Sequence, residues 1–264
     1  MMKNNPRKLA LEILTNFGID NPRDVTIEDV IYALNIPLKY SKLTNCDGRI
    51  IHGEGKSLIV INDSIDFETR RNFTLAHELG HYLMHRNDLI QHVDDSASLA
   101  WFDTKNKTKI SQQEIEANTF AAEILLPTHL FTEEVYKQPF DPNLIRSISD
   151  KYNVSRSSII YRFVEMGNHP ICVFYTKDNK VSYWKRSKDF NFKIKECTRI
   201  PPPHDSVAAE FFDDGTIYPL NESKQEISKS TWLEVKEEYA DDTFYEYCLV
   251  HSGTNLTISV IWED

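Results

Sequence analysis

The stretch RRNFTLAHELGHYLMH, residues 70–85, decides the fold of this chain. It continues a helical pattern that begins at about Asp66, and its apolar positions recur three and four residues apart, which is typical of a mostly buried helix. Within it, His77-Glu78-Leu79-Gly80-His81 has the spacing HExxH. Residues i and i+4 share one face of a helix, so both imidazoles can reach one zinc ion at about 2.0–2.1 Å. The stretch therefore predicts a metal centre on a helix.

Glu78 lies beside this predicted centre. A carboxylate in that position can take a proton from a water molecule that zinc activates, and can later pass the proton to the leaving amine of a cleaved peptide bond. We therefore predict Glu78 as the catalytic base of a hydrolase.

A catalytic zinc ion needs a third protein ligand with one position left for water. His85 continues the spacing of the two histidines, but eight residues along a helix span about 12 Å, too far for His77, His81 and His85 to hold one ion. The longer HExxHxxGxxH arrangement fails because Asn87 occupies its last position. The third ligand must therefore come from another element.

The segment EIEANTFAAEILLP, residues 114–127, is the best source of that ligand. Glu116 shares a helical face with residues that can pack closely against the first helix, namely Ala117, Phe120 and Ala121. A carboxylate on such an apolar face needs a counter-charge, which zinc supplies. We therefore predict Glu116 as the third ligand.

Three other polar residues of this segment are weaker candidates for a role at the metal. Glu114 and Glu123 lie on more polar arcs, where we expect solvated carboxylates. Asn118 fits two interpretations equally well: it holds a metal ligand in place, or it is simply a residue of the helix surface.

These two motifs, RRNFTLAHELGHYLMH and EIEANTFAAEILLP, together resemble the ImmA/IrrE family of metallopeptidases. The resemblance covers about residues 7–166. It implies a fold similar to gluzincin-type zinc peptidases, zinc bound by His77, His81 and Glu116, and Glu78 as the catalytic base. It also implies a substrate class, helix-turn-helix repressors, whose cleavage releases genes for phage-like element induction or stress response.

The pattern along the chain predicts an α+β protein of two domains. Residues 1–167 form a mainly helical, gluzincin-like domain: helices at 7–17 and from Thr26 precede a small sheet, and Ser111 begins a capping box for the second motif helix. Residues 168–264 have strand-like runs at 171–175, 181–184 and 257–262, with turns at 177–179 and 213–215, which predict a smaller, β-rich α+β domain. Two alternatives stay open for this domain: it is a sensor or substrate-docking unit, or its aromatic residues only pack its own core.

Residues 144–166 resemble a helix-turn-helix, with Ser155 as the cap of the second helix. Between 144 and 163, four basic residues and one acidic residue give a locally positive segment. Direct DNA contact is one interpretation, and completion of the peptidase core is the other. The competing hypothesis for the whole chain is accordingly a non-catalytic regulator that binds DNA or protein and has a structural metal site.

Composition restricts the class of protein further. The formal net charge of −10 argues against a protein whose main task is to coat nucleic acid. The N-terminal residues lack the apolar core of a signal peptide, and no run of about 18 apolar residues occurs, so we expect a cytoplasmic protein without a membrane partner. Four scattered cysteines form no CxxC pair, which argues against a thiolate zinc site.

Overall fold

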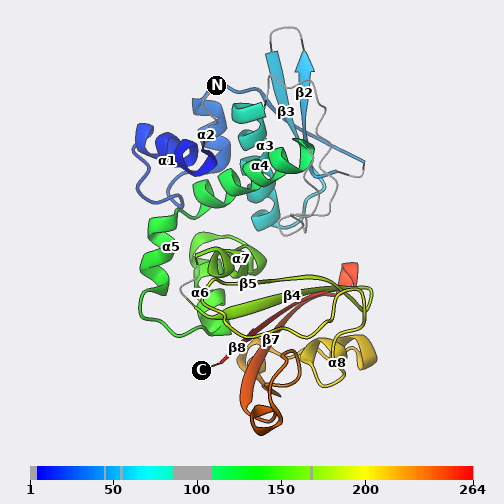
Figure 1. The fold of residues 1–264 in the computed structure, drawn as a ribbon. Helices are drawn as coiled ribbons and strands as arrows, with labels where there is room; N and C mark the ends of the chain where they lie inside the picture. Colours follow the sequence, from blue (N-terminus) through cyan, green and yellow to red (C-terminus); the bar gives the residue numbers. More distant parts are fainter. Residues whose placement is uncertain (1–4, 45, 54–55, 86–108, 167–168, 264) are drawn as a thin grey trace. The chain divides into compact units, whose positions relative to one another are not determined.

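The computed structural model describes residues 5–44, 46–53, 56–85, 109–166 and 169–263. These residues divide between two compact units, Met1–Glu134 with Asp150–Ser155, and Val135–Ser149 with Arg156–Asp264. Figure 1 shows a small sheet with helices in the first unit and a larger sheet in the second. The predicted α+β class, with a mainly helical first part and a β-rich last part, is confirmed.

The predicted domain boundary at residues 167–168 lies outside the described residues. The compact units divide the preceding helices differently from that prediction, because α7 (Arg156–Met166) and most of α6 (Pro142–Tyr152) belong to the second unit. The physical reason is that α7 packs against a strand of the larger sheet.

The first unit includes the helices α1 (Pro6–Asn16), α2 (Ile27–Ala33), α3 (Glu68–His85) and α4 (Lys109–Leu125) and most of α5 (Thr128–Val135). The side chain of Thr26 accepts a hydrogen bond from the backbone N–H of Asp29 and forms a capping box with it, so the predicted start of α2 is confirmed. The capping box predicted at Ser111 is wrong, because α4 begins two residues earlier and Ser111 lies inside the helix.

The small sheet consists of β1 (Leu38–Ser41), β2 (Gly48–Gly53) and β3 (Lys56–Asn62) in the order β1-β3-β2. Strand β1 runs parallel to β3, and β2 runs antiparallel to it. Ile59 and Ile61 of β3 are buried in the core that includes α3, which packs against β2 and β3, whereas Val60 points to the other face of the strand and packs with Leu43 and Cys46. The sheet thus supports the helix that carries HExxH.

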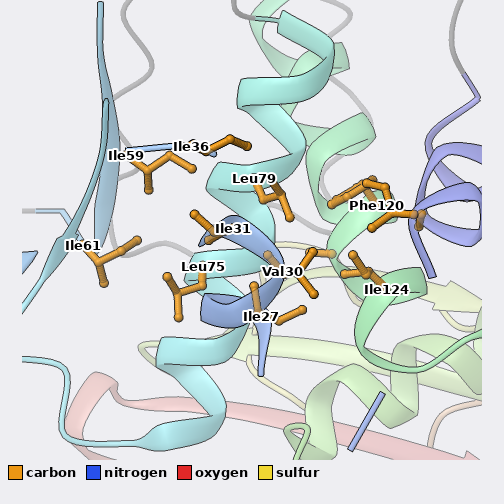
Figure 2. Close-up of a cluster of buried hydrophobic side chains, with 14 of the residues drawn as sticks. Ile27, Val30, Ile31, Ile36, Ile59, Ile61, Leu75, Leu79, Phe120 and Ile124 are labelled. Carbon is orange, nitrogen blue, oxygen red and sulfur yellow. The ribbon is translucent and has the colours of Figure 1, made fainter. Parts of the chain in front are cut away.

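The core of the first unit gathers apolar side chains from α2, the small sheet, α3 and α4, as Figure 2 shows. The helices α3 and α4 approach closely at Gly80. A Cβ atom at that position would lie 3.0 Å from Cδ1 of Phe120 and 3.3 Å from Cα of Ala117. The absence of a side chain at Gly80 therefore lets α4 lie directly against the motif helix.

The second unit is built on five antiparallel strands in the order β5-β4-β8-β7-β6. They are β4 (Ile171–Lys177), β5 (Lys180–Arg186), β6 (Gln225–Ser228), β7 (Thr243–His251) and β8 (Leu256–Trp262). The helix α8 (Val207–Asp214) packs on β7 and β8, and α7 packs on β4. No helix in the described part of the chain combines the length and the apolar character that crossing a bilayer requires.

Glu246 on β7 is fully buried and joins α8 to the sheet. Its carboxylate accepts hydrogen bonds from the backbone N–H groups of Val207 and Ala208 and from the indole Nε1–H of Trp232, at 3.0–3.1 Å. Burial raises the pKa of Glu246, while these hydrogen bonds oppose the rise.

We expect Glu246→Ala to lower the free energy of unfolding by about 3 kcal/mol or more, because it leaves three buried donors without an acceptor. Glu246→Gln, which keeps one side-chain oxygen, should cost less. Urea unfolding of both variants, followed by tryptophan fluorescence, measures the difference. Equal stability of Glu246→Ala and wild type would contradict this role.

Candidate metal centre

The two histidines of HExxH lie on one face of α3, as predicted. Both are buried, with 2% of His77 and 1% of His81 exposed. Their Nε2 atoms are 2.9 Å apart. Two imidazoles one turn apart therefore direct their Nε2 atoms toward the same point.

Glu114 of α4 lies at that point. One carboxylate oxygen is 3.2 Å from Nε2 of His77, and the other is 3.2 Å from Nε2 of His81. Tetrahedral zinc with bonds of about 2.0–2.1 Å separates its ligand atoms by about 3.3 Å, so these spacings and this donor set fit such an ion. His77, His81 and Glu114 could thus hold one metal ion.

The structure places Glu116 elsewhere, which corrects its predicted role as the third ligand. Its Oε2 atom is 3.1 Å from Nε2 of His85, and its Oε1 atom accepts a hydrogen bond from the side chain of Gln112 at 2.9 Å. Residues four apart share a helical face, so Glu114 and Asn118 face the two ligand histidines together. Glu116 lies on another arc of α4, and its carboxylate reaches His85 instead.

Asn118 contacts His77 directly, which decides between its two interpretations. Its Oδ1 atom is 2.8 Å from Nδ1 of His77, and both residues are buried. An imidazole that donates Nδ1–H to an amide oxygen keeps the lone pair of Nε2 for a metal ion. Asn118 therefore fixes the form of His77 that can bind a metal.

Glu78 is 1% exposed and lies against the small sheet. A Cβ atom at Gly48, the first residue of β2, would lie 2.7 Å from Oε1 of Glu78 and 2.8 Å from Cγ2 of Thr74. Only glycine leaves room for the Glu78 carboxylate beside the strand. This dependence on Gly48 was not predicted from the sequence.

The assignment of Glu114 predicts a difference between two glutamates of one helix. Loss of a group that only supports a metal ligand weakens metal binding by about 10–100-fold. Glu114→Ala should weaken zinc binding by more than this, because it removes a ligand itself. Glu116→Ala should stay within that smaller range because its carboxylate contacts His85 rather than the two ligand histidines. Competition with a chelating dye measures both dissociation constants. Stronger loss in Glu116→Ala than in Glu114→Ala would restore the original assignment.

Two arginines of the motif helix precede HExxH, while residues 86–108, which follow this helix, lie outside the described residues. The side chain of Arg70 forms an ion pair with Asp47, and that of Arg71 donates to the backbone oxygen of Ile65. These two arginines, which flank the motif, are thus engaged in contacts within the first unit.

The fold, together with three converging side chains that could hold a metal ion, is that of a metallopeptidase-like α+β protein. The family model described as "IrrE N-terminal-like domain" (Peptidase M78) matches residues 32–164, so the chain belongs to this family, and the resemblance found in the motifs is confirmed. A solved structure of a Mycobacterium tuberculosis transcriptional regulator has a similar fold, with a TM-score of 0.61 and 14% identity over 98% of this chain and 77% of that one. No curated protein matches the chain.

Proposed function

We propose that this protein is a zinc-dependent endopeptidase that cleaves a protein substrate. The observation that carries the proposal is the convergence of His77, His81 and Glu114, next to a buried Glu78. The substrate class that family membership suggests is a helix-turn-helix repressor, whose cleavage would release genes of a phage-like element or of a stress response.

The residues divide the chemistry between them. Zinc, when bound, polarises the scissile carbonyl and makes water more acidic. Glu78 accepts a proton from the attacking water and delivers it to the leaving amine. Asn118 keeps His77 in the form that binds the metal, and Glu114 supplies the anionic ligand.

The competing hypothesis, a DNA-binding regulator, finds little support in residues 144–163. A recognition helix must expose its side chains to the major groove. On α7, Arg162 is 2% exposed, and both Ile159 and Ile160 are buried. Lys151 at the end of α6 forms an ion pair with Glu134. These observations favour packing within the protein over DNA contact.

The test is cleavage of a defined protein. The zinc-loaded protein is incubated with the helix-turn-helix repressor encoded nearest to its gene and with the other repressors of the same genome, and mass spectrometry identifies fragments. We expect one discrete cut in one repressor, which a zinc chelator abolishes and added zinc restores. The result that would overturn the proposal is intact repressors together with operator DNA binding, in a gel-shift assay, that survives removal of zinc.

A further inference from the structure

His85, the third histidine of the motif helix, is buried beside His81 although it is too far along α3 to share the metal with His77. The Nδ1 atoms of His81 and His85 are 3.0 Å apart. On its other side, Nε2 of His85 is 3.1 Å from the Glu116 carboxylate. Three side chains from two helices thus form one hydrogen-bonded chain that ends at His81.

The hydrogens of this chain can be assigned from the acceptors. A carboxylate can only accept, so Nε2–H of His85 donates to Glu116. Neutral His85 then has a lone pair on Nδ1, and it accepts the Nδ1–H of His81. With its hydrogen on Nδ1, His81 keeps the lone pair of Nε2, the atom that points toward Glu114.

The two ligand histidines therefore have different supports. Asn118 accepts from His77 through a neutral amide. His85 accepts from His81, and the negative charge of Glu116 lies behind it. Gln112 donates to the other oxygen of Glu116 and holds that carboxylate in place. A carboxylate behind an imidazole raises its basicity toward a metal ion.

We propose that His85 and Glu116 are positioning residues that orient His81, fix its metal-binding form and strengthen its bond to the ion. The inference rests on the proposed metal site, and it gives a function to two residues that do not bind the ion themselves. It also explains why a carboxylate is present on the apolar arc of α4: its partner is an imidazole, not the metal.

The first test is metal affinity, measured by competition with a chelating dye. We expect His85→Leu and Glu116→Leu to weaken zinc binding by about 10–100-fold. His85→Gln should recover most of the affinity, because its amide oxygen can accept from His81 and its amide nitrogen can donate to Glu116. His129→Leu, the same change at an exposed histidine of α5, is the matched control and should bind zinc as wild type does.

The second test detects the Nδ1–H hydrogens of the two ligand histidines directly. In protein loaded with cobalt(II), proton NMR resolves the exchangeable Nδ1–H signals of the ligand histidines. His85→Leu should speed the exchange of the His81 signal with solvent and leave the His77 signal unchanged, whereas Asn118→Leu should do the reverse. A purely structural role for His85 would leave this pattern unmoved.

The outcomes separate the two proposals. Wild-type zinc affinity and both slowly exchanging signals in His85→Leu would overturn the positioning role while the endopeptidase proposal stands. Failure of the wild-type protein to bind zinc or cobalt would overturn the metal site and the positioning role together. Zinc binding that weakens in His85→Leu, without any proteolysis by the wild-type protein, would support the positioning role and overturn only the proposed reaction.

Discussion

Glu78→Gln is expected to bind zinc with wild-type affinity and to cleave its substrate about 10²–10⁴-fold more slowly. The amide has nearly the shape of the carboxylate, so the packing against Gly48 is kept. It cannot accept a proton from the attacking water, and this is the step that the carboxylate is proposed to perform. Single-turnover cleavage rates and zinc content, measured on the same preparation, check both parts.

The two measurements matter together because a loss of activity alone has several causes. A variant that lost its zinc would be inactive for a different reason, and it would not test the role of Glu78 as a base. Glu123→Gln changes the same functional group on α4, where Glu123 accepts hydrogen bonds from Thr128, and serves as the control. Cleavage by zinc-loaded Glu78→Gln at the wild-type rate would refute the proposed mechanism.

His81→Ala is expected to lose both zinc and activity. For the wild-type protein, zinc at about 100 times its dissociation constant should add about 2.7 kcal/mol of stability. For a unit of this size that corresponds to a rise in melting temperature of about 5–10 °C. The variant lacks one of three protein ligands, so its melting temperature should be the same with zinc and with chelator.

Differential scanning fluorimetry in zinc and in chelator gives this comparison directly. The apo proteins supply the internal reference, because any difference between apo wild type and apo His81→Ala reports the packing of the imidazole rather than the metal. His129→Ala should retain the full zinc-dependent rise. A zinc-dependent rise of wild-type size in His81→Ala would show that the ion binds elsewhere.

The sequence predicted those parts of the site that depend on local geometry. His77 and His81 lie four residues apart on one helix, so their common face follows from the helical repeat alone. The identity of the third ligand depends instead on how α4 crosses α3, which the repeat of one helix does not contain. The apolar neighbours of Glu116 favoured the wrong carboxylate. Asn118 was the residue from which the third ligand could have been found. If Asn118 contacts His77, Glu114, four residues earlier, lies on the same face of α4 and also points toward the histidines.

The elements of the second unit were predicted only in part. The β-branched and aromatic runs of β4, β5 and β8 predicted these three strands, whereas β6 and β7 were not predicted. The helix α8 was not predicted, although Ser206 caps its start and Gly215 ends it in the left-handed region. From the sequence, Gly215 is interpreted as part of a turn, because a glycine at this position is typical both of a turn and of the end of a short helix.

The burial of Glu78 has a consequence for the charge balance of the centre. Two carboxylates, Glu78 and Glu114, lie beside the two imidazoles, and the carboxylate of Glu116 lies behind His81 and His85. Little water reaches Glu78 to stabilise this excess of negative charge, so a divalent cation offsets more of it than a monovalent cation does. The charge balance thus favours doubly charged ions before coordination geometry discriminates among them.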